Sequence, residues 1–230
     1  MAHHPPGSSH AALKTALDNP DASVRLAAAL RAGTLPDPVS VPLLVACCGT
    51  DADFFVRDML TWALTRHPQA DTLPLLLAEL NSPRAQARSQ ALHTLSKIGD
   101  PGTWSAITRA HLHDADPEVA RTAWRTAAGL APVSQRDGLA RELVLELGRG
   151  DTDLKRSLSR ALAMLGDAAI AFLQAAAAKH KRPSVRVHAR ATLRLIADPE
   201  GPFVLDPADA RTMAPSLPRA TDSARPSGQR

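Results

Sequence analysis

Apolar residues along positions 9–198 are spaced three and four apart, which places their side chains on one face of an α-helix. The pattern also recurs at a longer period, because six helical segments can be aligned on one apolar column. The members of that column are Val24, Val56, Ala87, Val119, Leu154 and Val185. A second column of small or apolar residues follows four positions later in each segment. A repeat of about 32 residues with this internal spacing predicts stacked helix pairs.

The segments between these six helices carry apolar stripes of their own and are expected to form the first helix of each pair. They cover residues 42–47, 73–80, 104–112, 139–147 and 169–174. Asp, Ser or Pro commonly stands where a second helix begins, as helix N-termini prefer. No stretch alternates apolar and polar residues in the way of a β-strand. The sequence therefore predicts an all-α solenoid of about six helix pairs over residues 9–198.

The two ends of the chain depart from the helical pattern. Residues 1–8 are expected to form a flexible N-terminus. Residues 199–230 contain prolines at positions 199, 202, 207, 215, 218 and 226, which predicts a disordered or loosely docked tail. The apolar run Phe203-Val204-Leu205 could attach the start of this tail to the last helix.

Within the repeats, the motif Asp-x-x-Val-Arg-x-x-Ala-x-x-x-Leu, closing with Leu-x-x-Ile-Gly-Asp, resembles the HEAT repeat in its short bacterial form. Residues 84–100 match this motif best, and the resemblance covers about four fifths of the chain. Ala120 and Lys155 replace the arginine of the motif in repeats four and five, which affects the surface rather than the fold. The resemblance implies a HEAT-like α-solenoid with an extended concave surface.

The composition limits the class of protein. The longest apolar run, residues 168–178, is too short to span a bilayer, and the first residues lack the pattern of a secretory signal. We therefore expect a soluble, cytoplasmic protein with no membrane partner. The adjacent Cys47 and Cys48 allow no disulfide framework and are expected to be packing residues. The net charge of +4 is compatible with nucleic acid, but arginine richness also follows from the codon usage of a high-GC bacterial genome.

An arginine follows the first apolar column directly in four of the six repeats. These residues are Arg25, Arg57, Arg88 and Arg186, with Lys155 in the equivalent position of repeat five. In the HEAT-like units that the sequence resembles, such an arginine contacts an acidic residue in the loop of a neighbouring repeat. Asp21, Asp53 and Asp116 stand in suitable loops and are the expected partners. Ligand binding by these arginines is the alternative interpretation.

Polar and aromatic residues of the second helices are candidates for a binding surface on the concave face. Positions two, five and six residues after the first apolar column are expected to point away from the core between paired helices. These positions predict a contact ridge formed by Asp58, Trp62, His93, Arg121, Trp124, Arg125, Arg156 and Arg160. Tryptophan and arginine are frequent binding hot spots, and the four arginines favour an acidic partner. Alternatively, Trp62 and Trp124 fill core space beside alanines.

The most basic stretch lies in the last helix. Four arginines recur there at four-residue intervals, and they are Arg182, Arg186, Arg190 and Arg194. No acidic residue occurs between positions 179 and 194. Guanidinium groups along one helix face could contact the phosphates of a nucleic acid. The alternative is a solvated outer face, which the terminal repeat of a solenoid needs for solubility.

A local resemblance supports the nucleic-acid alternative. Residues 53–64 are similar to a helix of the HEAT-like alkylpurine DNA glycosylases, in which a concave tryptophan contacts the strand that carries the lesion. Only Trp62 carries over to that functional tryptophan, and residues 9–33 do not match the aspartate–tryptophan pair that these enzymes also use. The packing of an ordinary HEAT repeat explains Phe54 and Phe55 equally well.

The sequence contains no motif of a catalytic or cofactor-binding site. It has no nucleophile elbow, phosphate-binding loop or dinucleotide fingerprint, so no catalytic residue, cofactor or metal is assigned. The metal-binding HEAT-type hydroxylases use repeated His-Glu pairs, and this dipeptide does not occur here. His111 and His113 are two positions apart and would point away from each other on a helix.

The leading hypothesis is a non-enzymatic HEAT-repeat scaffold that binds a protein or peptide partner on its concave face. A nucleic-acid-binding protein related to the alkylation-repair glycosylases is the alternative. A HEAT-like lyase or chaperone, similar to those that act on light-harvesting proteins, is a further alternative that no particular residue supports.

Overall fold

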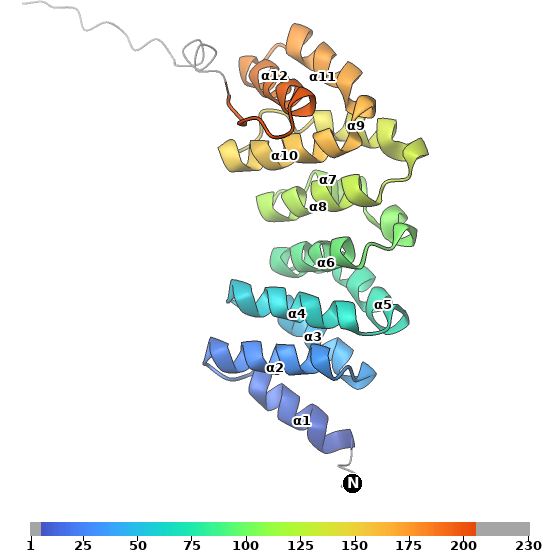
Figure 1. Ribbon diagram of the computed structural model, residues 1–230, viewed down its shortest axis with the longest axis vertical. Coiled ribbons are helices and arrows are strands. Elements are labelled where there is room, and N and C mark those ends of the chain that lie inside the picture. Colours follow the sequence, from blue (N-terminus) through green and yellow to red (C-terminus); the bar gives the residue numbers. More distant parts are fainter. Residues whose placement is uncertain (1–5, 206–230) are drawn as a thin grey trace, which may run out of the picture.

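The computed structural model of the protein describes residues 6–205, and within this range the chain forms α-helices, short 3-10 helices and no strand (Figure 1). The architecture is the all-α solenoid that the repeat pattern predicts. Residues 1–5 and 206–230, which belong to the expected flexible ends, lie outside the described range. Residues 6–8, also expected to be flexible, instead begin the first helix, because Pro6 suits a first helical position. No described helix is long and apolar enough to cross a membrane.

The described helices form six consecutive pairs, in agreement with the six aligned repeats. The first helices are α1 (Pro6–Leu17), α3 (Val41–Cys48), α5 (Gln69–Glu79), α7 (Arg109–Leu112), α9 (Arg136–Val144) and α11 (Asp167–Lys179). The second helices are α2 (Ala22–Thr34), α4 (Phe54–Arg66), α6 (Ala85–Ile98), α8 (Pro117–Leu130), α10 (Thr152–Leu165) and α12 (Pro183–Ala197). The 3-10 helices are η1 (Pro38–Ser40), η2 (Pro101–Ala106) and η3 (Val133–Gln135).

The second helices stack directly on one another along the molecule. α2 packs on α4, α4 on α6, α6 on α8, α8 on α10 and α10 on α12, and Figure 1 shows them as successive layers. The two apolar columns form the core of the stack, where Val56, Leu60, Val119 and Ala123 are fully buried. Val24, in the first repeat, is the exposed member of the column. We call the exposed side of the six stacked helices the second-helix face.

Aspartates determine where four of the second helices begin. The carboxylates of Asp21, Asp53, Asp116 and Asp151 accept hydrogen bonds from backbone N–H groups in the first turns of α2, α4, α8 and α10. These N–H groups have no partner inside a helix, so the cap satisfies them and fixes the first residue. The recurring aspartate of the repeat motif is therefore a helix cap.

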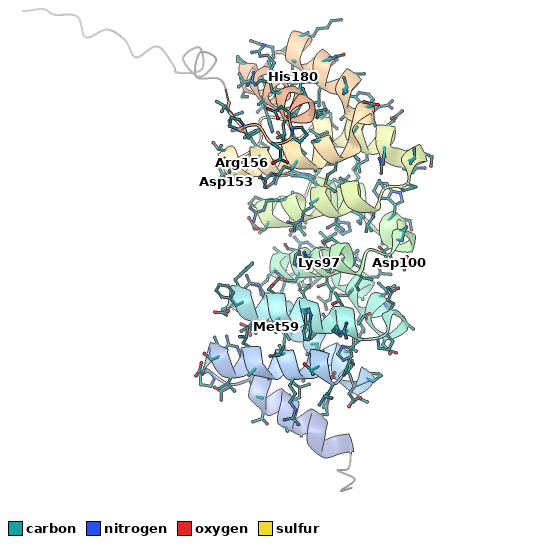
Figure 2. All side chains as sticks on the ribbon, viewed as in Figure 1. Met59, Lys97, Asp100, Asp153, Arg156 and His180 are labelled. Atoms are coloured by element: carbon teal, nitrogen blue, oxygen red, sulfur yellow. The ribbon has the colours of Figure 1, made fainter. Side chains whose placement is uncertain are left out.

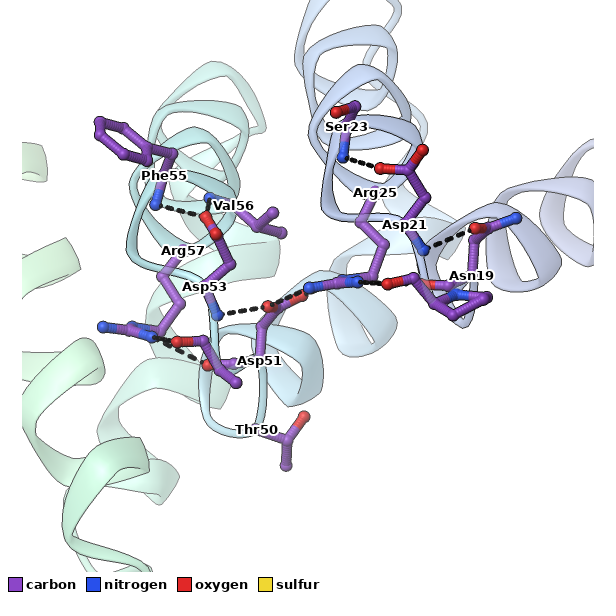
Figure 3. Close-up of polar contacts among 12 residues, drawn as sticks. Asn19, Asp21, Ser23, Arg25, Thr50, Asp51, Asp53, Phe55, Val56 and Arg57 are labelled. Atoms are coloured by element: carbon purple, nitrogen blue, oxygen red, sulfur yellow. Dashed lines mark hydrogen bonds and ion pairs between the residues drawn. The ribbon is translucent and has the colours of Figure 1, made fainter.

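The recurring arginines join neighbouring repeats through a different set of acids. Arg25 forms a two-pronged ion pair with Asp51 of repeat two, at 2.7 and 2.9 Å (Figure 3). Arg88 forms the equivalent pair with Asp114 of repeat four, at 3.0 and 3.1 Å. The partners expected from the sequence are wrong, because these arginines pair with other carboxylates, and the expected residues cap helices instead. The expected residues are Asp21, Asp53 and Asp116. The true partner stands two residues before the cap.

Two of the arginines bind the loop of their own repeat instead. Arg57 donates to the carbonyl oxygens of Asp51 and Ala52, at 2.9 and 2.8 Å (Figure 3). Repeat three has Ser82 at the position where a carboxylate would be needed, so Arg57 forms no link to that loop. Arg186 likewise donates to two carbonyls of the loop before α12.

Repeat four departs from the single first helix expected over residues 104–112. The chain forms η2, an extended Ile107 and then the one-turn helix α7. His111 holds this break, because its Nδ1 accepts the Thr108 N–H at 3.0 Å and its Nε2 donates to the Leu80 carbonyl at 3.1 Å. Because the Thr108 N–H donates to His111, it does not form the backbone hydrogen bond that a continuous helix would require of it.

The described part of the tail contacts the last two second helices. After α12 the chain turns back and crosses the second-helix face between α12 and α10 (Figure 1). Arg194 donates to the Val204 carbonyl at 2.8 Å, and the Phe203 ring meets the His188 ring edge to face. These contacts confirm that the Phe203-Val204-Leu205 segment attaches the start of the tail to the solenoid.

Candidate functional site

A groove of about 390 Å³ crosses the second-helix face. It runs over α4, α6 and α8 and reaches α10. Its lining residues are Phe54, Arg57, Asp58, Ser89, Gln90, His93, Glu118, Arg121, Thr122, Arg125 and Ser157. Most of them stand two, three or six positions after the first apolar column, because helix geometry brings these positions to one side. The groove therefore combines short segments from four repeats.

Four residues of the predicted contact ridge meet in this groove: Asp58, His93, Arg121 and Arg125. His93 connects α4 with α8, because its Nε2 lies 3.9 Å from Asp58 Oδ1 and its Nδ1 lies 3.3 Å from Arg125 Nη2. Burial, together with the charges of Arg125 and Lys97, lowers the pKa of His93, and Asp58 opposes this shift. A neutral His93 accepts the Arg125 N–H on Nδ1 and keeps its own proton on Nε2, the nitrogen nearer Asp58.

Arg125 brings into the groove a positive charge that has no counter-ion among residues 6–205. Burial and the neighbouring charge of Arg121 lower the pKa of Arg125, with Glu118 acting in the opposite direction. Glu118 is itself paired with Arg121, and within residues 6–205 no carboxylate lies at ion-pair distance from Arg125. A partly desolvated guanidinium without a counter-ion favours an acidic ligand, because a carboxylate would replace the lost solvation.

Two exposed aromatic residues at the start of α4 belong to this surface. Phe54 and Phe55 are 63% and 71% exposed, and their rings stand edge to face at 5.6 Å. The Arg57 guanidinium lies 6.0 Å from the Phe54 ring. Of the two interpretations that the sequence left open for these residues, packing in the core does not hold, because they precede the buried Val56 by two and one positions and are exposed. The sequence contains a sign of this exposure, because at the same two positions before the apolar column the other repeats carry small or polar residues or proline.

The two tryptophans of the predicted ridge have opposite environments. Trp62 is 37% exposed and lies against Gly33 of α2, where an added Cβ would meet the indole at 2.3 Å. Trp124 is fully buried, and its indole N–H donates to the Leu112 carbonyl at 2.7 Å. The prediction that Trp124 belongs to the binding surface is therefore wrong. Trp124 stands five positions after the apolar column and Trp62 six, and one position turns a side chain by about 100°.

In other repeats too, the residue five positions after the apolar column is buried rather than exposed. Thr61 and Ser159 occupy this position and are buried. Their hydroxyl groups lie 3.3 and 2.7 Å from those of Thr94 and Thr192 on the next second helix. These pairs satisfy polar groups inside the stack. The ridge residues that reach the surface therefore stand two or six positions after the apolar column, although Ser89, Val187 and Ala191 are buried at the same positions.

Arg156 and Arg160, the remaining ridge residues, lie on α10 outside the groove lining. Arg156 pairs with Asp153 at 3.1 Å, and its guanidinium lies 5.9 Å from the Phe203 ring of the tail. Figure 2 labels Arg156 and Asp153 at the start of α10, next to the returning tail. Arg160 is exposed and makes no hydrogen bond or ion pair with a described residue. Both arginines extend the positive charge of the second-helix face toward the last repeat.

The four arginines predicted as a phosphate-binding ladder do not form one free row. Arg186 donates to backbone carbonyls of the loop before α12, and Arg194 donates to the Val204 carbonyl. Arg182 precedes α12 and is exposed, whereas Arg190 is partly buried. The guanidinium groups of Arg186 and Arg194 are thus already engaged by the chain itself.

A cluster of charged side chains joins α9 and its following turn to the turn after α7. His113 lies 2.6 Å from Glu146 and 3.0 Å from Glu142 through its two ring nitrogens. Burial lowers the pKa of His113, but these hydrogen bonds outweigh burial and raise the pKa. Arg109 and Arg149 pair with the same carboxylates. In the described part of the chain, no group of three or more His, Cys, Asp or Glu side chains is placed to hold a metal ion.

The two cysteines are packing residues, as the sequence indicates. Cys48 is buried, and burial raises the pKa of its thiol to about 12. Burial also raises the pKa of the partly exposed Cys47. Both side chains therefore keep their protons at neutral pH and supply no nucleophilic thiolate.

Comparisons with known proteins identify the family. A family model described as HEAT repeats matches residues 1–65 and 52–129. Human deoxyhypusine hydroxylase in complex with glycerol is a similar solved structure, with 19% identity, a TM-score of 0.44, and coverage of 84% of this chain and 86% of that chain. The complex of CpcE and CpcF of phycocyanin lyase from Nostoc sp. PCC7120 is another, with 18% identity, a TM-score of 0.36, and coverage of 93% and 95%. No curated protein matches the chain. Because the family match extends over more than half of the sequence, the chain belongs to the HEAT-repeat family.

Proposed function

We propose that the protein is a scaffold whose groove on the second-helix face binds an acidic protein or peptide partner. The observation that carries this proposal is the Arg125 guanidinium, which lines the groove, has no counter-ion in the described part of the chain, and contacts the neutral His93. A partner carboxylate that reaches Arg125 would form a charge-assisted hydrogen bond that the chain itself does not supply. Stacked helix pairs provide the extended surface that such binding requires.

The aromatic residues beside the groove extend the proposed partner chemistry. Phe54 and Phe55 project from the first turn of α4, and Trp62 is exposed on its last turns. Exposed aromatic rings next to arginine side chains are the residue types that dominate binding energy in protein interfaces. The proposed partner therefore carries carboxylates together with at least one large apolar side chain.

The proposal is tested by comparing partner capture by three forms of the full chain. Tagged wild-type protein, Arg125→Glu and Arg66→Glu are each incubated with a nuclease-treated lysate of the source organism, and retained proteins are quantified by mass spectrometry. Arg66 is the matched control, because it is an exposed arginine of α4 outside the groove lining. We expect at least one acidic protein to be retained by wild type and Arg66→Glu and to fall about tenfold or more with Arg125→Glu.

Two results would contradict this function. Equal retention of every captured protein by Arg125→Glu and wild type would show that the groove is not the binding surface. Capture from an untreated lysate that is absent from the nuclease-treated lysate would instead favour nucleic-acid binding, the alternative that the sequence suggests.

A further inference from the structure

The start of the C-terminal tail already occupies part of the second-helix face. Pro202–Leu205 has no helical structure and crosses between α12 and α10. The Phe203 ring lies 5.9 Å from the Arg156 guanidinium and 6.2 Å from the His188 ring. One residue later, the Val204 carbonyl accepts a hydrogen bond from Arg194 at 2.8 Å. An extended segment is thus held by an aromatic contact and a backbone hydrogen bond, each involving an arginine.

The sequence around this contact has the chemistry of the partner proposed above. Residues 198–209 read Asp-Pro-Glu-Gly-Pro-Phe-Val-Leu-Asp-Pro-Ala-Asp, with four acidic residues and no lysine or arginine. The second helices beneath the segment present the opposite charge, because Arg156 and Arg160 lie on α10 and Arg194 lies on α12. The segment therefore combines an aromatic residue with a charge opposite to that of these three arginines.

The occupied site is continuous with the groove. Arg156 directly precedes Ser157, which belongs to the groove lining. Arg156 also stands two positions after the apolar column, the same repeat position as Arg121 in the groove. The face thus offers an arginine at corresponding points of two successive repeats, and the tail covers one of them.

We propose that the segment around Phe203 is an internal ligand of the second-helix face. This inference rests on the proposed function and specifies its partner: an extended acidic segment with an aromatic residue, rather than a helix. An external segment of this chemistry competes with the tail for the surface formed by α10 and α12. Because the tail is tethered next to its site, its effective concentration is in the millimolar range, and it reduces the apparent affinity for any competitor.

The test uses a fluorescein-labelled peptide with the sequence of residues 198–209. Its binding to the full chain is measured by fluorescence anisotropy for wild type, Phe203→Ala and Val204→Ala. We expect Phe203→Ala to bind the peptide about fivefold more tightly than wild type, which corresponds to a tail that fills the site about four fifths of the time. Val204→Ala is the matched control, because Val204 contributes a backbone carbonyl and its side chain is 46% exposed. We expect this variant to bind like wild type.

A second peptide, in which alanine replaces the phenylalanine, should lose binding to the Phe203→Ala chain. Equal affinity of wild type and Phe203→Ala would overturn the internal-ligand proposal, as would undiminished binding of the alanine peptide or no binding to any chain. The tail is the same in wild type and Arg125→Glu, so the comparison of partner capture between these two forms does not depend on how strongly the tail competes. The proposed function can therefore fail or succeed independently of this inference.

Discussion

Trp62 and Trp124 occupy repeat positions that differ by one residue, six and five positions after the apolar column. This difference of one residue decides whether the indole faces solvent or the core. Both lie on second helices beside small residues, so composition and hydrophobic spacing alone leave both environments open. The apolar columns predict the buried stripe of each second helix correctly. The stripe also includes the residue five positions after the first column, however, and ends before the residue six positions after it. Thr61 and Ser159 show why this edge was not predictable from polarity: they are polar residues that are buried because a hydroxyl of the next helix pairs with each.

The two tryptophans are expected to have different effects on stability. Trp124→Ala should lower the free energy of unfolding by about 3–5 kcal/mol, because it opens a cavity and leaves the Leu112 carbonyl without its hydrogen bond. Trp62→Ala should cost only about 1 kcal/mol, because Trp62 is already 37% exposed. Guanidinium chloride unfolding followed by circular dichroism measures both values. Similar costs for the two variants would disagree with the environments described here.

His188 makes the stability of the last repeats depend on pH. It is fully buried, its Nδ1 accepts the Gly148 N–H at 2.9 Å, and its Nε2 donates to the Lys155 carbonyl at 2.9 Å. Burial lowers its pKa to about 4, although the hydrogen bond to Lys155 acts in the opposite direction. The folded chain therefore disfavours the protonated ring, whereas the unfolded chain accepts a proton near pH 6.5.

Unfolding measurements across this pH range test the role of His188. The free energy of unfolding should fall by about 3 kcal/mol as the pH decreases from 6.5 to 4, and this contribution should level off below pH 4. The difference in the free energy of unfolding between wild type and His188→Gln isolates the contribution of His188 from that of other titrating groups such as His113. If the two proteins show parallel stability curves over this range, His188 does not titrate as described.

At the scale of the helix and its loops, the repeat motif predicts six pairs because it encodes both the buried columns and the aspartate caps. It does not predict the arginine partners, because the recurring aspartates of the motif cap helices, and the carboxylates that bind Arg25 and Arg88 stand two positions earlier in the loop. It also does not predict the broken first helix of repeat four. That break depends on a hydrogen bond from His111 to Leu80, and contacts between elements so far apart in sequence are invisible to periodicity.

The ion pair between Arg88 and Asp114 is expected to couple repeats three and four. A double-mutant cycle with Arg88→Met and Asp114→Asn should give a coupling energy of about 1–2 kcal/mol, because the two partly buried groups share two hydrogen bonds. Asparagine retains an oxygen that can accept the Asp116 N–H, so the loop is preserved. A coupling energy below about 0.3 kcal/mol would mean that the pair contributes nothing to the stack.

At the scale of the whole molecule, stacking converts residues about 32 positions apart into one surface. Four residues that stand two or six positions after the apolar column share that surface in the groove, and they are Asp58, His93, Arg121 and Arg125. The repeat positions do not predict that, among the described residues, Arg121 has a counter-ion and Arg125 has none, because pairing depends on side-chain geometry. Nor do they predict that the tail crosses the face, since its proline-rich sequence carries no helical register.

Site-specific photo-crosslinking tests the central claim, that the groove is the partner-binding surface. A photoreactive phenylalanine analogue replaces Phe54, which borders the groove, or Val133, which is exposed on η3 outside it. After irradiation in the source organism, we predict a covalent adduct with a partner at position 54 and not at position 133, and loss of that adduct in the presence of Arg125→Glu. An adduct at position 133 with none at position 54 would contradict the groove as the functional site.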